Sequence, residues 1–188
     1  RKESSAASDV YKRQALYDPS FSASGAQVRK GPKKGLVTII PSGKKVDISV
    51  SSGGTLIGKE SFKVRDVPKP SVVAFAKGKP VDQKQGMRAP GPRSINMKAI
   101  AEQGFKEFLP KDARYRVAKW EIMLVRGKRP VARQNVSSET ANLSSFAQKA
   151  KPGDRILIDV KKVQRATYTG AVENVDLPTT IINIPLTD

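Results

Sequence analysis

The sequence at positions 114–126 is RYRVAKWEIMLVR, in which apolar residues recur at alternate positions. Alternate residues of a strand point to the same face, so this pattern predicts a long β-strand with one face in a hydrophobic core. The residues predicted for that face are Ala118, Trp120, Ile122 and Leu124. The opposite face is predicted to carry Tyr115, Val117, Met123 and Val125 together with Lys119 and Glu121. A turn is predicted next, at Gly127–Pro130.

Residues 15–67 also have the pattern of β-structure. The apolar run Gly35–Ile40 is closed by Pro41-Ser42-Gly43, and Lys44–Ser52 alternates apolar and polar residues before the turn Ser52-Gly53-Gly54. We interpret residues 15–67 as a partial β-sandwich domain that consists of the closing strands, with the opening strands missing.

The segment Val67-Pro68-Lys69-Pro70 is the expected domain boundary. Two prolines force extended backbone and cannot donate hydrogen bonds to a strand ladder, so residues 68–70 are predicted to form a stiff linker. Residues 71–188 are then the second unit.

The second unit is predicted to combine strands with two short helices. Helices are expected at Ser94–Gln103 and at Ser138–Ala150, and Lys77–Arg93 is expected to be an exposed loop or a long hairpin. Strands are expected around Ile156–Val160 and at Thr179–Leu186, where Pro185 indicates an edge. The predicted fold class is mainly β, with β-sandwich or immunoglobulin-like domains and two short helices in the C-terminal domain.

Residues 1–14, RKESSAASDVYKRQ, differ in character from the rest of the chain. The segment is polar, has no strand period and resembles a translated sequencing-adapter string found at the ends of metagenome-derived sequences. We expect an artefactual or disordered tail, and the alternative is a genuine basic arm. Because the chain also begins without methionine or an apolar signal core, a fragment is favoured over a complete cytoplasmic protein.

The composition argues against an enzyme. The 188 residues include no cysteine and no histidine, which removes thiol nucleophiles, thiolate metal sites and the commonest general base. Gly53–Lys59 has the spacing of a phosphate-binding loop, but Glu60 follows it and the context is strand–turn–strand, so a hairpin turn is the preferred interpretation. We expect no catalytic residues, metal, cofactor or small-molecule substrate.

The net charge of +18 predicts an acidic partner, which could be a protein surface, an anionic lipid or nucleic acid. Residues 77–133 hold 15 Lys and Arg against 5 Asp and Glu, a net charge of +10. The candidate partner-binding residues surround the predicted turn and are Arg126, Lys128, Arg129 and Arg133. A solvated face without a partner is the alternative for this stretch. A basic nucleic-acid-binding β module is the alternative function, although few aromatic residues are present for base stacking.

The string Glu60–Pro70, ESFKVRDVPKP, resembles the C-terminal region of the GldM family of gliding-motility and type IX secretion proteins, called PorM in non-gliding bacteria. Three more features occur in the order of that family: the helix expected at Ile95–Gly104, the strand around Tyr115–Trp120, and the turn and strand KPGDRILIDV at 151–160. The closing segment 177–184 is also similar. Ser71–Arg93 departs from the family, because it is longer and richer in proline than the usual compact turn.

The resemblance implies a periplasmic stalk protein without chemistry of its own. Family members are anchored to the inner membrane by an N-terminal helix that pairs with GldL, and their β domains form an elongated dimer that reaches the GldK–GldN ring under the outer membrane. This chain would then be the part nearest the ring, with the anchor in the missing N-terminal region. Homodimerisation, docking onto the ring proteins and transmission of force are what the resemblance predicts.

Overall fold

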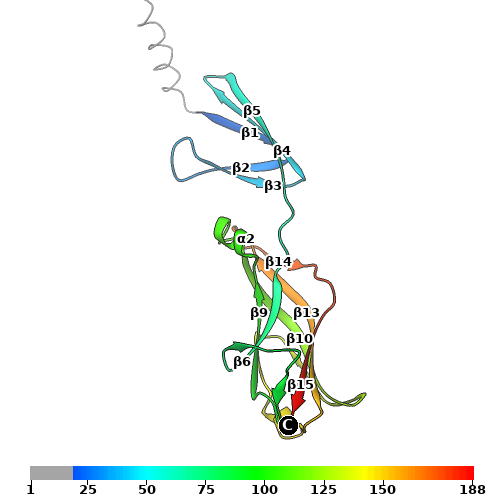
Figure 1. The fold of residues 1–188 in the computed structure, drawn as a ribbon. Helices are drawn as coiled ribbons and strands as arrows, with labels where there is room; N and C mark the ends of the chain where they lie inside the picture. Colours follow the sequence, from blue (N-terminus) through cyan, green and yellow to red (C-terminus); the bar gives the residue numbers. More distant parts are fainter. Residues whose placement is uncertain (1–18) are drawn as a thin grey trace, which may run out of the picture. The chain divides into compact units, whose positions relative to one another are not determined.

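The computed structural model describes residues 19–188 (Figure 1). The tail predicted at residues 1–14 lies outside this range. The contacts within the chain divide it between Val67 and Pro68 into two compact units. Within residues 19–188, no helix has the length and apolar character needed to cross a membrane.

The first unit contains two small antiparallel sheets. One sheet has the order β1 (Ser20–Ser24), β4 (Lys45–Ser52), β5 (Thr55–Lys63), and the other pairs β2 (Ala26–Lys30) with β3 (Val37–Pro41). Gly53 and Gly54 form the turn between β4 and β5 with positive φ angles of 57° and 82°, which glycine adopts without strain. The phosphate-loop spacing at Gly53–Lys59 is therefore a hairpin, as preferred from the sequence.

The first unit buries little apolar surface. Among its described residues, Val46 is the one hydrophobic side chain that is fully buried, whereas every residue of β5 is exposed. The exposed residues of β5 include Leu56, Ile57 and Phe62. The described strands of this unit thus lack a covering layer over β5.

The second unit is a sandwich of two sheets (Figure 1). The large sheet has the order β11 (Arg129–Val136), β10 (Arg114–Arg126), β13 (Arg155–Ala166), β15 (Thr180–Thr187), β8 (Met87–Arg88), and β14 (Val172–Val175) also pairs with β13. The small sheet has the order β12 (Thr140–Asn142), β9 (Ser94–Ile100), β6 (Ser71–Ala76), β7 (Lys79–Pro80). The helices are α2 (Gln103–Phe108) and α3 (Ser144–Ala147). The predicted mainly β class with two short helices is confirmed.

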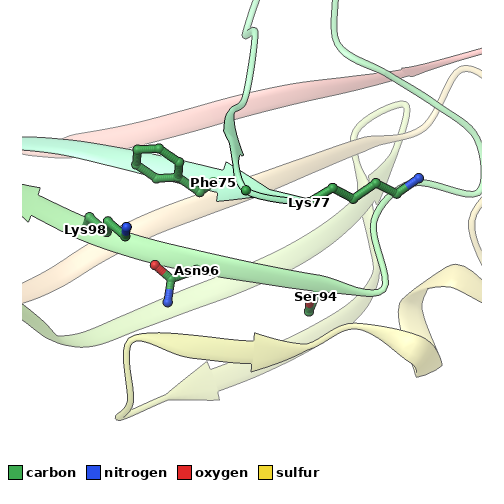
Figure 2. A pocket seen from close by; sticks show the side chains of 6 residues that line it. Phe75, Lys77, Ser94, Asn96 and Lys98 are labelled. Carbon is green, nitrogen blue, oxygen red and sulfur yellow. The ribbon is translucent and has the colours of Figure 1, made fainter.

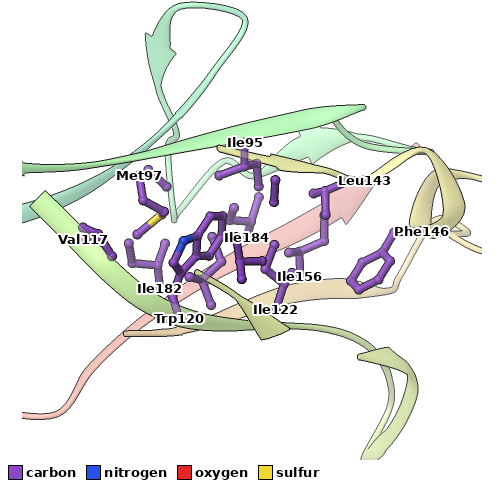
Figure 3. Close-up of a cluster of buried hydrophobic side chains, with 14 of the residues drawn as sticks. Ile95, Met97, Val117, Trp120, Ile122, Leu143, Phe146, Ile156, Ile182 and Ile184 are labelled. Atoms are coloured by element: carbon purple, nitrogen blue, oxygen red, sulfur yellow. The ribbon is translucent and has the colours of Figure 1, made fainter. Parts of the chain in front are cut away.

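A single hydrophobic core fills the space between these sheets (Figure 3). Trp120 of β10 lies among isoleucines of the large sheet and opposite Met97 and Ile95 of the small sheet. Its ring is 1% exposed, and its indole Nε1 donates a hydrogen bond of 2.6 Å to the Ser138 carbonyl oxygen. A buried indole needs such an acceptor, so this bond fixes both the ring and the chain that passes over it.

The two faces of β10 differ from the prediction at its N-terminal half. Val117 is 1% exposed and belongs to the core with Trp120, whereas Ala118 is only partly buried. The register with β13 shifts between Val117 and Lys119 and again between Lys119 and Trp120. The first shift leaves an extra residue on β10 and the second an extra residue on β13, so both strands change phase and remain paired. A strict period of two cannot predict such a bulge.

The helix predicted at Ser94–Gln103, which the family resemblance placed at Ile95–Gly104, is wrong. Ser94–Ile100 forms β9, pairing with β6 on one side and β12 on the other, and the helix begins only at Gln103. Ile95 and Met97 are 1% and 0% exposed and alternate with polar neighbours. Burial of these two side chains against Trp120 outweighs the weak helical spacing of Met97, Ile100 and Ala101.

The helix predicted at Ser138–Ala150 is much shorter in the structure. Thr140–Asn142 is the strand β12, and α3 spans Ser144–Ala147. The expected apolar stripe is partly present, because Leu143 and Phe146 are buried in the core. The Asn142 side-chain oxygen accepts a hydrogen bond of 2.8 Å from the Ser144 amide, which favours starting the helical turn there.

The segment Lys77–Arg93 is more ordered than an exposed loop. It contains β7 and β8, and Val81, Met87 and Ala89 pack against the core. β8 pairs in parallel with the end of β15, through Leu186 and Thr187. Gly86 lies so close to the Pro185 carbonyl oxygen that a Cβ atom there would collide with it, and its φ of 72° also favours glycine.

We predict that Trp120→Phe lowers the free energy of unfolding by about 2–4 kcal/mol, because it leaves a cavity in the core and removes the hydrogen bond to the Ser138 carbonyl. Urea denaturation followed by far-UV circular dichroism measures the loss. Phe108→Ala is the control, since Phe108 is 87% exposed and its removal should change stability by less than about 0.5 kcal/mol. Equal effects of the two substitutions would contradict this description of the core.

Candidate interaction surface

The four candidate residues lie on the β10–β11 hairpin and its tip. Arg126 ends β10, Arg129 begins β11, and Lys128 is in the turn between them. Arg126 and Arg129 are opposite each other in the register, while Arg133 lies opposite Met123 further along the hairpin. All four are exposed. The structure therefore places the predicted residues on one hairpin, but their surroundings differ.

Arg126, which lies next to the turn of the hairpin, is held by a carboxylate that immediately precedes β13. Its Nε and Nη2 atoms donate hydrogen bonds of 2.8 Å each to the two carboxylate oxygens of Asp154. Its Nη2 atom also donates to the Lys149 carbonyl oxygen at 3.0 Å. Planar two-point contact of this kind is the strongest geometry for an arginine–carboxylate pair. The Nε and Nη2 donors of this guanidinium are thus used in hydrogen bonds within the chain.

Asp154 is the buried member of this pair. Its side chain is 2% exposed, against 45% for that of Arg126, and it also accepts a hydrogen bond of 2.9 Å from the Lys151 amide. The Arg126 hydrogen bonds, helped by the Lys151 amide, hold the pKa of Asp154 below its usual value. The same contact raises the pKa of Arg126. This carboxylate therefore joins the turn at 151–154 to the end of β10.

Arg133 also has a carboxylate partner. Its Nε lies 3.0 Å from a carboxylate oxygen of Glu121 on the neighbouring strand, and its Nη2 lies 3.6 Å from the Met123 sulfur. Lys128 and Arg129, by contrast, take part in no ion pair with any residue of 19–188. The turn beneath them is braced by Arg155, which donates a hydrogen bond of 2.9 Å to the Gly127 carbonyl oxygen. The free positive charge of the hairpin is therefore at its tip.

The outer face of the small sheet carries a shallow hollow of about 330 Å³ (Figure 2). Phe75 and Lys98 lie side by side on β6 and β9, with the Lys98 Nζ atom 4.9 Å from the centre of the Phe75 ring. Asn96 and Ser94 continue the lining along β9, and Lys77 lies at the turn after β6. The lining contains no acidic residue, so it offers no pair of groups for acid–base chemistry.

Acidic residues elsewhere are also dispersed. Within residues 19–188, no three acidic side chains gather in a way that could hold a metal ion. Several described carboxylates have a basic partner: Asp154 pairs with Arg126 and Glu121 with Arg133, while Asp112 and Glu173 share Arg165.

Comparison with known protein families assigns both units. The description "GldM C-terminal domain" matches residues 68–187, and "GldM third domain" matches residues 13–65. The chain belongs to the GldM family. It is thereby a component of the gliding-motility and type IX secretion apparatus, and GldM is a structural component of that apparatus. A comparison with individual curated proteins finds no match.

The GldM-like strings of the sequence have clear positions in the fold. Phe62 lies near the end of β5, and the two prolines at 68 and 70 enter the second unit, where Pro70 is buried. Tyr115 donates a hydrogen bond of 2.9 Å to the Pro68 carbonyl oxygen. In the turn at 151–154, Gly153 has a φ of 87° and Asp154 provides the carboxylate for Arg126.

Sequence reasoning missed Asp154 and Glu121 as parts of this surface. Asp154 follows Pro152 and Gly153, and a buried acid after such a turn is a signal for a local anchor. Its partner Arg126 is 28 residues away, so the pair itself could not be read from the sequence. The alternation of β10 predicts Glu121 on the face opposite Trp120, and the ion pair with Arg133 forms only because β11 pairs with this strand.

We predict that Asp154→Asn lowers the free energy of unfolding at pH 7 by about 2–3 kcal/mol, because Arg126 loses its carboxylate. The folded-state pKa of Asp154 is lowered, so its contribution is present above the ordinary aspartate pKa of about 3.9 and is lost as the pH falls through the folded-state pKa. The difference between wild type and variant should therefore shrink toward about pH 3.

Urea titrations at several pH values measure this difference. Asp159→Asn is the matched control, because Asp159 pairs with Lys161 on the surface and its loss should cost at most about 1 kcal/mol. A difference for Asp154→Asn that stays constant down to about pH 3 would contradict the proposed role of the charge.

Proposed function

We propose that this chain is a non-catalytic structural and adaptor region of the type IX secretion and gliding-motility motor. It would dock onto ring proteins associated with the outer membrane and transmit conformational change to them. The observation that carries the proposal is the match of both units, in order, to two consecutive GldM domains. A sequence without histidine or cysteine, built into two strand-rich units, is consistent with this role.

The proposal includes location and partners. The region would lie in the periplasm and be anchored to the inner membrane through an N-terminal helix outside this sequence, where a GldL-type protein binds. It would act as a homodimer, and its ring partners would be of the GldK and GldN type. These features come from the family resemblance and rest on the family match.

The docking surface proposed is the β10–β11 hairpin with Arg126, Lys128, Arg129 and Arg133. Lys128 and Arg129 would make the contact, because their charges are unpaired within residues 19–188 and they lie at the tip. Arg126 and Arg133 already bind Asp154 and Glu121, so they would mainly hold the hairpin in shape. An acidic partner surface is the complement of such a tip.

Transmission of force would use the connection between the linker and β10. The hydrogen bond from Tyr115 to the Pro68 carbonyl fixes the entry of the second unit to the start of β10. From there β10 runs 13 residues to Arg126, with Trp120 buried in its middle. A pull on the linker would then reach the hairpin through one continuous, core-anchored strand.

The net charge of +18 keeps a nucleic-acid-binding module as the second candidate. Phosphate contacts release counterions. If the chain binds nucleic acid, the logarithm of its binding constant should therefore fall steeply and linearly with the logarithm of the salt concentration. A filter-binding titration with nucleic acid at increasing salt therefore tests this second candidate.

A pull-down tests the adaptor role. Retention of the ring proteins by the chain at low salt supports that role, and no retention would contradict it.

We predict that Lys128→Glu combined with Arg129→Glu weakens binding to the ring proteins by about 1–3 kcal/mol, because both charges face the acidic partner. Biolayer interferometry with purified ring proteins measures the change. The control is Lys79→Glu with Lys84→Glu, which changes the net charge equally at exposed positions of the β7 region. A similar loss in the control would mean that only the overall charge matters.

A further inference from the structure

The first half of β10 has an open edge. Residues Arg114–Lys119 pair with β13 on one side, but pairing with β11 on the other side begins only at Trp120 and Val136. After Val136 the chain leaves the large sheet and enters the small one as β12. Within residues 19–188, no strand continues β11 along this part of β10. Backbone donors and acceptors on that side therefore face outward without a strand partner.

A basic hollow of about 520 Å³ lies at the same place. It is lined by the edge residues Val117 and Ala118, by the outward side chains of Arg116 and Lys119, and by Lys162 and Gln164 of β13. The crossing segment 137–139 closes one end. Three basic side chains and one acidic side chain, that of Glu139, line the hollow, which leaves a net charge of +2.

Two lysines in this hollow face each other. Lys119 and Lys162 are register partners on β10 and β13, at the position of the double bulge. Like charges directly opposite each other in a sheet are destabilising. Within residues 19–188, no carboxylate lies within 4.0 Å of either ammonium group, although the neighbouring Lys161 is paired with Asp159. An anionic group placed between the two lysines would reduce the repulsion between their ammonium groups.

Arg116 adds a third charge that lacks an acidic partner. Its Nε and Nη2 donate to the side-chain oxygen of Gln164 at 3.1 and 2.8 Å. Gln164 is in turn fixed by donating to the Asn174 side-chain oxygen at 3.2 Å. The guanidinium is thus oriented by a neutral amide, and its remaining donors stay available for a carboxylate.

We propose that this edge and hollow bind an extended acidic segment of a partner protein by strand addition. The segment would continue the line of β11 along Arg114–Lys119, using backbone hydrogen bonds for affinity. Six residues of strand span about 20 Å. Its carboxylates would lie between Lys119, Lys162 and Arg116. A polypeptide fits better than nucleic acid, because the hollow has no aromatic side chain for base stacking.

This inference rests on the proposed adaptor role and names a second surface for it. The hollow lies along Arg116–Lys119 in the first half of β10, whereas Lys128 and Arg129 follow the last residue of that strand, Arg126. The two surfaces can therefore be tested separately. Loss of ring-protein binding through the tip and loss of peptide binding through the hollow are independent results.

The test uses the whole chain and a fluorescein-labelled peptide of eight residues in which glutamate alternates with valine. Fluorescence anisotropy at low salt should show binding to wild type. Lys162→Glu should weaken it at least about tenfold. This variant places a glutamate opposite Lys119, so it should not lower thermal stability, and loss of binding cannot then be due to unfolding. Lys79→Glu, the same change on exposed β7, should alter binding less than about twofold.

Two further probes separate the alternatives. A peptide with alternate amides N-methylated cannot add as a strand, and it should bind at least about tenfold more weakly than its parent. Equal binding of the methylated peptide, or no binding of the parent peptide to wild type, would overturn the proposal. The proposal would also be overturned if a single-stranded oligonucleotide bound wild type more tightly than the peptide and failed to bind Lys162→Glu, since the hollow would then be a nucleic-acid site.

Discussion

The burial of Trp120 is the constraint on which the second unit depends. Its ring fills the centre of the sandwich, and its indole donor must find an acceptor, which is the carbonyl of Ser138. That hydrogen bond holds the chain where it leaves β11 and crosses to β12 in the other sheet. The crossing supplies a strand for the small sheet, and it also ends β11 early. The open edge of β10 therefore begins where this crossing starts.

The positive charge of the chain is distributed unevenly along β10. On the β10–β11 hairpin, two arginines are neutralised by carboxylates: Arg133 by Glu121 and Arg126 by Asp154. Two other places carry basic residues that have no acidic partner within residues 19–188. These are Lys119 with its register partner Lys162 near the middle of β10, and Lys128 and Arg129 at the hairpin tip. The paired charges are used in contacts within the fold, and the unpaired charges are available to partners.

The two units of this GldM chain differ in how they are stabilised. The second unit has one core that includes residues from both sheets and from α3. The first unit has one fully buried hydrophobic side chain among its described residues, Val46, and exposes Leu56, Ile57 and Phe62 on β5. Apolar burial is the main favourable term in folding, so most of the stability of residues 19–188 belongs to the second unit.

Composition and alternation alone predict the mainly β class, the strand patterns at 44–52, 114–126 and 156–160, and the lack of imidazole and thiol groups. These are local properties of the chain. The remaining features depend on tertiary packing. Ser94–Ile100 carries both a strand and a helix spacing, and its position opposite Trp120 selected the strand. The bulge moved Val117 into the core, and cross-strand register brought Lys119 to Lys162 and Arg126 to Asp154. Register depends on how distant strands pack, and no local pattern contains that information.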